Sequence, residues 1–399
     1  MKRVLLSVSL YMLDIFTKKG KSALTLEEVT ELLQHLRIPL SLVFTPTNLK
    51  EEKKKFFNSD TYEPIFEYKV VKNRNDEILK ELANVKLISD VDPRISDFYI
   101  KLIESKKLAS DLMHSVGNND LVTELSLKKY RAPSATLFRN SARVLRGKLD
   151  NYDVRINTKI DRGEKLHYEQ IENVFNVAFE MLGLEGWSVA TSKNISKNGI
   201  KVGIKRKQIL VDSNITRSEF KIKKTLIHEV GTHVLRSING FETGFPALGN
   251  ANLTSYLDIE EGLATWNEES MGYLTDKWLK KKAGMVWAIY LGENLSFREL
   301  YNALSGNFLK YSSWDIAYRV KRGLEDTSYP GIYGKDIVYF RGFRKVKRIL
   351  EKDPTMYEKF YAGKIDYKRT RWVDEGLLAK PKIVPTKEMW KEIFKKAGI

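Results

Sequence analysis

The segment Lys224–Leu235, read as KTLIHEVGTHVL, constrains this chain more than any other stretch. It carries two of the five histidines, His228 and His233, and Glu229 follows directly after the first. The leucine, isoleucine and valine residues around them predict a helix packed into a core. The nearest known pattern is H-E-x-x-H, in which two zinc-binding histidines lie one helical turn apart and the glutamate acts as general base. Here the spacing is one residue longer.

That extra residue matters because of helix geometry. On a regular helix, positions i and i+4 point about 40° apart, whereas positions i and i+5 point about 140° apart, too far for two imidazoles to share one ion. Gly231 lies between the histidines, and a glycine there eases either a one-residue π-bulge, of the kind found at functional sites, or a local unwinding of the helix. We therefore predict an irregular helix at Val230–Thr232 that brings His228 and His233 together. Two nearby histidines also occur in ordinary cores, so the motif alone leaves a metal site and a structural pair open.

A third ligand is available in the segment Tyr256–Ser270, read as YLDIEEGLATWNEES. Two adjacent glutamates in the first turn of a helix can simply complement its dipole. Glu260 and Glu261, however, are followed by Gly-Leu-Ala and resemble carboxylates that enter a buried helix. A catalytic zinc site typically uses three protein ligands and keeps the fourth position open for water. The sequence offers such a set.

The conjunction of these motifs resembles a known family. H-E-V-G-T-H followed by E-G-L-A is similar to the microtubule-associated tyrosine carboxypeptidases, the tubulin detyrosinases, and to prokaryotic relatives named for a QEGLA motif. Trp314–Gly342 is similar to the family segment R-V-x-R-G … K-D-x-x-Y-x-x-G, and the resemblance runs from about Pro46 to near the end. Glu260 occupies the position at which that motif has glutamine. This replacement retains the candidate ligand Glu261 but changes the local charge.

Short strands are predicted at Val154–Ile160, Trp187–Thr191, Ile200–Ile204 and Gln208–Val211, directly before the metal-binding helix. This is the layout of zincin peptidases, in which an edge strand grips an extended peptide by β-pairing. We expect a mainly helical, zincin-like α+β metallopeptidase with a small mixed sheet. Its parts are expected to be an N-terminal extension of unknown role (1–45), a helical lobe (46–150) and a catalytic domain (151–399).

The resemblance implies one zinc ion per chain, held by His228, His233 and Glu261, with Glu229 as general base. An exopeptidase also needs a cation for the terminal carboxylate. Arg319 and Arg322 lie three residues apart, so they can share one helical face. Lys335 is a further candidate for the substrate, and Tyr339 could stabilise the oxyanion. A purely structural cluster of ion pairs and hydrogen bonds is the alternative for these four residues. The family implies release of a C-terminal tyrosine or phenylalanine.

Composition bears on partners. The formal net charge of +17 favours acidic partners, such as an acidic C-terminal tail of a peptide or protein, and a solvated basic surface without a partner is the alternative. The lysine-rich run in the predicted helix Asp276–Trp287 is expected to be such a solvated face. The absence of cysteine excludes disulfides and thiolate ligands. No apolar run reaches the ~20 residues that cross a bilayer, and Asp14 interrupts a signal-like N-terminus, so a cytoplasmic location is expected.

Two other functions stay open at this level. A zinc endopeptidase would have a cleft open at both ends, and Arg319 and Arg322 would bind no chain terminus. A binder of anionic polymers would carry a relict metal site and show no turnover. No signature of a nucleic-acid-binding fold is present, so nucleic acid is not the expected partner. The sequence does not indicate an oligomeric state.

Overall fold

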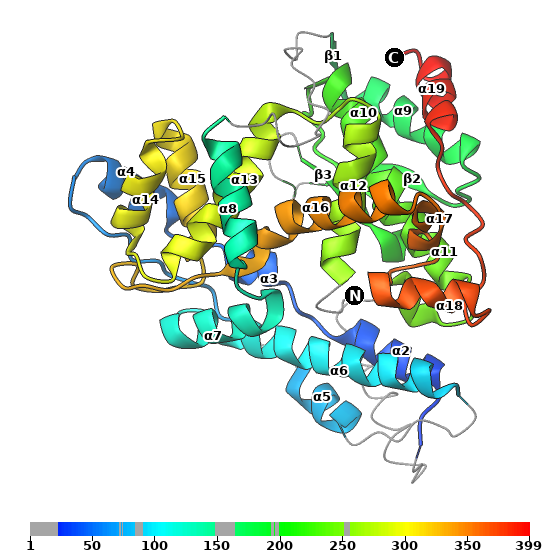
Figure 1. Ribbon diagram of the computed structural model, residues 1–399, viewed down its shortest axis with the longest axis horizontal. Coiled ribbons are helices and arrows are strands. Elements are labelled where there is room, and N and C mark those ends of the chain that lie inside the picture. Colours follow the sequence, from blue (N-terminus) through cyan, green and yellow to red (C-terminus); the bar gives the residue numbers. More distant parts are fainter. Residues whose placement is uncertain are drawn as a thin grey trace.

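The computed structural model describes residues 23–71, 73, 75–83, 91–147, 164–192, 195, 199–250 and 256–399. The described chain is mainly helical and carries two small sheets, which confirms the expected α+β class (Figure 1). The predicted strand Val154–Ile160 and the signal-like N-terminus lie outside the described residues.

The N-terminal part consists of helices. The helix α2 begins after a capping box, because the Thr25 side chain accepts from the Glu28 backbone N–H and the Glu28 carboxylate accepts from the Thr25 N–H. Figure 1 shows α2, α6 and α7 along one side of the molecule, with α5 packed on α6. The bounds in this part are α2 (Leu26–His35), α3 (Leu40–Val43), α4 (Leu49–Phe57), α5 (Asn75–Ala83), α6 (Pro93–His114), α7 (Asn119–Tyr130) and α8 (Ala135–Leu145).

A three-stranded mixed sheet precedes the histidine-bearing helix in the chain, as the sequence predicts. Its strands are β2 (Ser188–Thr191), β3 (Ile200–Gly203) and β4 (Gln208–Val211), in the order β2-β4-β3. β4 pairs parallel with β2 and antiparallel with β3, so β3 is an edge strand. The helix α9 (Tyr168–Met181) packs on β2, and a second sheet pairs β1 (Lys165–Leu166) with β5 (Arg217–Ser218).

One irregular helical rod holds the histidine motif. It is formed by α10 (Glu219–His228), the π-helix η2 (Glu229–Val234) and α11 (Leu235–Phe241). The edge strand β3 lies against η2, and α12 (Tyr256–Ser270) packs along the rod. The two glutamates of the second motif therefore face the histidines from a neighbouring helix.

Two motif glycines explain how closely α12 approaches α16 (Ile337–Lys352). A Cβ atom at Gly262 would overlap the backbone carbonyl of Gly342, and a Cβ atom at Gly342 would overlap the carbonyl of Asp258. Any side chain at either position would push the helices apart. Because α16 carries Tyr339 and α12 carries Glu261, this crossing fixes the distance between two candidate site residues.

The remaining elements surround these helices. α12 contributes to all three apolar clusters of the structure, through residues such as Leu257, Leu263 and Tyr256. Among the described helices, none is both long and apolar enough to cross a bilayer. The other bounds are η1 (Ile204–Arg206), η3 (Pro246–Gly249), α13 (Asp276–Gly292), α14 (Phe297–Ser305), α15 (Lys310–Lys321), η4 (Gly334–Asp336), α17 (Met356–Phe360), η5 (Tyr367–Thr370), α18 (Arg371–Asp374) and α19 (Lys387–Lys396).

Candidate metal centre and active site

The predicted irregularity of the histidine helix is confirmed. The six residues of η2 form a π-helix, in which the hydrogen bonds run from i to i+5 instead of i to i+4. Positions five apart therefore stack on one face, and the rings of His228 and His233 lie 4.9 Å apart between centroids. The extra residue of the motif is absorbed by the wider turn.

Tertiary contacts hold this turn from behind. The Tyr361 hydroxyl donates to the Gly231 carbonyl at 2.7 Å, and the Asn267 amide donates to the Thr232 hydroxyl at 2.8 Å. The indole of Trp390 covers Gly231 so closely that an added Cβ would lie 2.6 Å from Trp390 Cζ2. Glycine is thus required here for packing.

Replacing Gly231 with alanine is expected to destabilise the fold by about 1–3 kcal/mol, because the new methyl group overlaps a buried indole. Chemical denaturation would measure the loss. Gly306→Ala is the matched control, since no atom lies within 4 Å of a Cβ at that position and its φ of −69° suits alanine. Equal stability of the two variants would contradict the packing argument.

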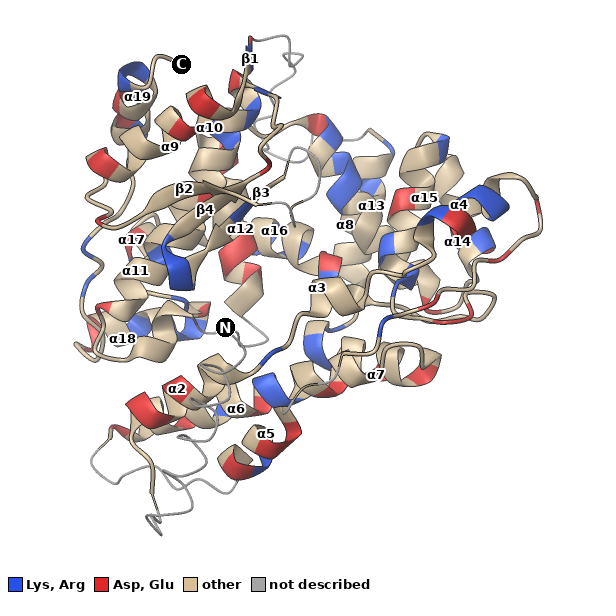
Figure 2. Cartoon of the chain, turned by 180° about the vertical axis from the view of Figure 1, so that it is seen from behind, with Lys and Arg blue, Asp and Glu red and all other residues tan. Residues whose placement is uncertain are grey.

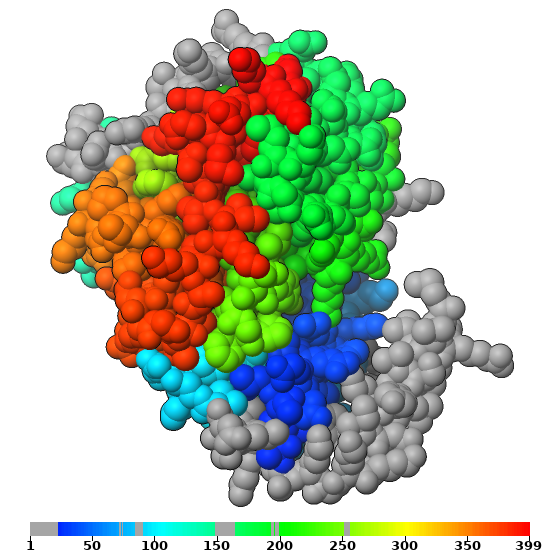
Figure 3. Space-filling view, turned by 90° about the vertical axis from the view of Figure 1, so that its right-hand side faces the viewer, coloured from blue at the N-terminus to red at the C-terminus, as the bar shows by residue number. Residues whose placement is uncertain are grey.

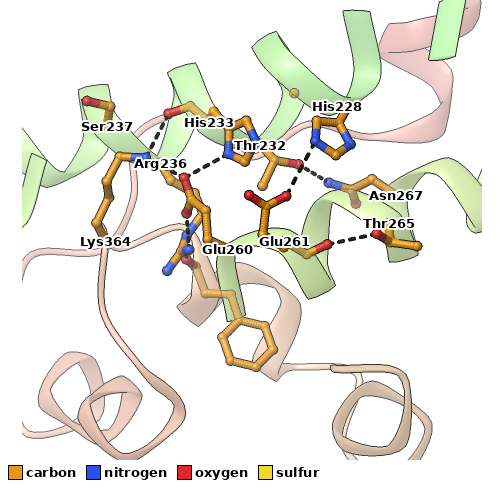
Figure 4. A network of polar contacts seen from close by, with 12 residues as sticks. His228, Thr232, His233, Arg236, Ser237, Glu260, Glu261, Thr265, Asn267 and Lys364 are labelled. Carbon is orange, nitrogen blue, oxygen red and sulfur yellow. Dashed lines mark hydrogen bonds and ion pairs between the residues drawn. The ribbon is translucent and has the colours of Figure 1, made fainter. Parts of the chain in front are cut away.

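The three candidate ligands converge, as Figure 4 shows. One nitrogen from each of His228 and His233 and one carboxylate oxygen of Glu261 all lie within 4.8 Å of one another. His228 Nε2 is 3.7 Å from Glu261 Oε2. Ligand atoms about 2.0–2.2 Å from a zinc ion would be separated by similar distances. All three side chains are half-buried, and a two-histidine, one-carboxylate donor set suits zinc.

Two further carboxylates orient the imidazoles. Glu268 Oε1 lies 2.8 Å from His228 Nδ1, and Glu260 Oε1 lies 2.8 Å from His233 Nδ1. Each ring therefore presents Nε2 to the shared centre, which is the arrangement by which carboxylates fix and strengthen histidine ligands. Burial lowers the pKa of His228, but the hydrogen bond and charge of Glu268 outweigh burial and raise it to about 9. The donor set fits a divalent cation.

Glu260 is the anionic centre of a buried network (Figure 4). Its carboxylate pairs with Arg236 and with Lys364 as well as with His233. Arg236 is fully buried and also donates to the carbonyls of Phe360 and Ile365, at 2.7 and 2.9 Å. Burial alone would raise the pKa of Glu260, but the charges of Lys364 and Arg236 hold it well below its ordinary value.

The substrate-binding candidates form a second cluster beside Glu261. Arg319 donates from Nε and Nη2 to the two oxygens of Asp336, both at 2.7 Å, and Arg322 Nη2 lies 3.9 Å from the same carboxylate. Although burial raises the pKa of Asp336, the hydrogen bonds from Arg319 lower it to about 2. Arg319 is therefore already occupied by an ion pair, whereas Lys335 forms no ion pair with any described residue.

Tyr339 lies in the same cluster. The charge of Glu261, followed by burial, raises the pKa of Tyr339 well above its ordinary value, so its hydroxyl stays protonated at neutral pH. Lys335 lies on η4 and Tyr339 in the first turn of α16, and the negative charge of Glu261 acts on both side chains.

One expectation from the sequence is wrong. The lysine-rich run of α13 is not wholly a solvated face, because Lys282 is half-buried with its Nζ 3.4 Å from the centroid of the Tyr339 ring. Burial lowers the pKa of Lys282 to about 8. The helix turns this one lysine inward, beside the site, while its neighbour Lys281 pairs with Asp315.

Glu229 faces a different part of the site. It lines a cavity of about 550 Å³, into which the edge strand β3 contributes Ile200. Arg217 lines the same cavity and donates to the Thr225 hydroxyl at 3.0 Å. Burial lowers the pKa of Arg217, and the negative charge of Glu229 opposes that effect. The full lining is Ile200, Thr216, Arg217, Lys221, Lys224, Thr225, His228, Glu229 and Glu268.

Sequence reasoning missed Glu268, Arg236, Lys364 and Lys282. A signal existed for Glu268, because Glu261 and Glu268 lie seven residues apart in one helix and therefore on one face. For the other three no local pattern distinguishes them from the many surface lysines and arginines. In Figure 2 basic and acidic residues are interspersed over the helices.

Comparison with known proteins gives a consistent result. A family model described as microtubule-associated tyrosine carboxypeptidase matches residues 54–396. The chain is 34% identical over 141 residues to the Mus musculus protein named "Putative tyrosine carboxypeptidase MATCAP2", covering 34% of this chain and 27% of that protein. It is 24% identical over 229 residues to the Mus musculus microtubule-associated tyrosine carboxypeptidase 1, covering 56% of this chain and 48% of the relative. The matches thus span half or less of the relatives' length.

Proposed function

The chain belongs to the microtubule-associated tyrosine carboxypeptidase family, whose model matches residues 54–396, and we propose that it is a zinc-dependent carboxypeptidase acting on the C-terminal peptide bond of a peptide or protein. The observation that carries the proposal is the convergence of donor atoms from His228, His233 and Glu261 across a π-helical turn. A zincin-like fold is part of the proposal, supported by the edge strand β3 lying against the histidine helix.

The residues fit one zinc ion per chain. His228 and His233 would bind it through Nε2, since Nδ1 of each ring faces a carboxylate, and Glu261 would supply an oxygen. When bound, zinc polarises the scissile carbonyl and lowers the pKa of a coordinated water. Glu260 and Glu268 keep the rings oriented for this task.

Side chains of the protein would transfer the proton of the attacking water and stabilise the negative charge on the carbonyl oxygen. Glu229, which lines the cavity beside His228, would accept a proton from the attacking water and deliver it to the leaving amine. Tyr339, whose raised pKa keeps its hydroxyl protonated, would donate a hydrogen bond to the carbonyl oxygen as negative charge develops there. Lys282 above the Tyr339 ring would place a positive charge near the same oxygen.

An exopeptidase must also bind the terminal carboxylate of its substrate. Lys335 and Arg322 are the better candidates, because Arg319 is committed to Asp336 in a bidentate ion pair. We assign Arg319 and Asp336 the role of holding Arg322 and Lys335 in place. The substrate backbone would pair with the edge of β3 that no described strand occupies, as extended peptides commonly do on edge strands.

The substrate is proposed from two further observations. The names of the relatives indicate tyrosine as the released residue, and we extend the proposal to phenylalanine because the two side chains share an aromatic ring. The net charge of +17 favours an acidic tail. A microtubule-associated relative also supports a cytoplasmic site of action.

Peptides that differ only at the terminal carboxylate test this function. Zinc-loaded protein is expected to release the last residue from an acidic peptide ending in free tyrosine, to leave the matched tyrosine-amide peptide intact, and to bind about one zinc per chain. A chelator should stop the reaction, and added zinc should restore it. Mass spectrometry of the products would report each outcome.

The opposite results identify the alternatives. Internal cleavage of the amidated peptide would mean an endopeptidase with an open-ended cleft. No cleavage of either peptide, together with steeply salt-dependent binding of polyanions, would favour a non-catalytic binder.

A further inference from the structure

A second cavity borders the histidine helix at Gly231, where Trp390, one of its lining residues, covers that glycine. It has a volume of about 740 Å³ and is bounded by the end of α12, the start of α17 and the segment 382–390. Figure 3 shows this C-terminal segment, in red, running across one face of the molecule beside the orange part of the chain. None of the residues proposed for catalysis lines it.

The walls of this cavity, which we term the rear pocket, are aromatic. Trp266, Tyr357 and Trp390 all line it, and the rings of Trp266 and Tyr357 lie 5.1 Å apart between centroids. Met271, Val384 and two prolines complete the apolar surface. A volume of this size is ordinary for a small-molecule site, and such walls favour a flat aromatic ring.

The rim carries charges of both signs. Lys387 and Glu358 line the pocket, are exposed, and form no ion pair with any described residue. Lys382 also lines it but pairs with Glu242. One cation and one anion beside an aromatic wall match a zwitterion that bears an aromatic side chain.

Hydrogen bonds connect the rear pocket to the histidine turn. Asn267, a lining residue, donates to the Thr232 hydroxyl, and Tyr357, another, donates to Asn267 Oδ1 at 3.1 Å. Trp390 covers Gly231 directly. A molecule held between Trp266, Tyr357 and Trp390 would therefore press on the side chains that hold the π-helix, and through it on the two histidines.

We propose that the rear pocket binds a free aromatic amino acid and lowers the activity of the metal site when it is occupied. Its ring would lie against Trp266 and Tyr357, its carboxylate would meet Lys387, and its ammonium would meet Glu358. The inference rests on the proposed function in one respect, because an aromatic amino acid is the product class of that reaction. The pocket would then sense accumulated product.

Fluorine NMR of the full chain labelled with 5-fluorotryptophan tests the binding. The protein would carry Glu229→Gln to prevent turnover, and Trp266→Phe and Trp390→Phe would assign two of the seven tryptophan resonances. Adding L-phenylalanine is expected to shift the Trp266 and Trp390 signals in a saturable manner. Phenethylamine, which lacks the carboxylate, should bind more weakly.

A charge reversal at the rim distinguishes L-phenylalanine binding in the rear pocket from binding in the active site. Lys387→Glu is expected to weaken L-phenylalanine binding roughly threefold or more, and Lys391→Glu, an exposed position on the same helix that does not line the pocket, should leave it unchanged. In active protein, L-phenylalanine should lower kcat with KM unchanged, and Lys387→Glu should relieve this inhibition without changing the basal rate.

The outcomes are distinguishable from those of the proposed function. If the protein hydrolyses the tyrosine peptide but L-phenylalanine does not shift the Trp266 and Trp390 resonances, the proposed binding in the rear pocket is wrong. The carboxypeptidase function would be unaffected by that result. The opposite pattern is also possible: L-phenylalanine shifts the resonances, Lys387→Glu weakens this binding, and the chain hydrolyses no peptide. That result would support the rear pocket and contradict the carboxypeptidase function. Equal effects of Lys387→Glu and Lys391→Glu would overturn the binding pose.

Discussion

Replacing Glu229 with glutamine is expected to lower kcat for peptide hydrolysis by ~10²–10⁴-fold, the range that a positioned general base contributes. Glutamine has nearly the same shape but cannot accept the water's proton. The side chain lines the cavity beside His228 and is not one of the three converging ligands. Zinc content and unfolding free energy should therefore stay close to those of the parent protein.

Steady-state kinetics with the free-acid tyrosine peptide would measure the loss, and metal analysis would confirm that zinc is retained. Glu219→Gln makes the same chemical change in the first turn of α10, away from the cavity lining, and should leave the rate unaltered. A Glu229→Gln protein that works at the parental rate would remove Glu229 from the mechanism. If the Glu229→Gln protein loses zinc as well as activity, Glu229 has a structural role in the metal site instead.

The second large effect is expected at Glu260. Glu260→Ala should destabilise the fold by about 3–5 kcal/mol, because it leaves Arg236 and Lys364 as buried cations without their anionic partner. The same change removes the carboxylate that orients His233, so zinc affinity should fall about 10–100-fold. Denaturant titration and competitive zinc titration would measure the two losses.

A comparison with the neighbouring glutamate separates the two roles. Glu261→Ala should abolish tight zinc binding while costing far less stability, since Glu261 is half-buried and forms no ion pair with Arg236 or Lys364. In the double variant Glu260→Gln/Lys364→Met, removal of one cation should recover part of the stability lost in Glu260→Gln alone. Strictly additive effects of those two changes would contradict the proposed coupling.

The adjacent glutamates also show how far sequence reasoning reaches. Their position at the start of a buried helix, together with the family resemblance, is enough to nominate Glu261 as a ligand. The same pattern cannot reveal that Glu260 orients His233 and also pairs with Arg236 and Lys364, because these two partners lie 24 and 104 residues away. Only packing brings them together.

The basic residues near Asp336 and Tyr339 are also only partly predictable from the sequence. Helical spacing predicts that Arg319 and Arg322 share a helical face. In the structure α15 ends at Lys321 and Arg322 is its C-cap residue, and both guanidinium groups lie at Asp336. The spacing could not show that Arg319 forms a bidentate ion pair with Asp336. Lys335 and Arg322 are therefore the better candidates for binding a substrate carboxylate. The neighbouring lysines predict a solvated position for Lys282, but the packing of α13 against α16 places its Nζ over the Tyr339 ring.

The spacing of His228 and His233 is enough to predict an irregular helix around Gly231, because two imidazoles five positions apart diverge on a regular helix. Local patterns in the sequence also predict the three short strands before the motif, which the structure contains. Tertiary structure alone decided which carboxylates support the histidines, which cations are already paired, and where the rear pocket opens. These depend on close approach between helices distant in the chain, such as the glycine crossing of α12 and α16, and no local pattern records such a distance.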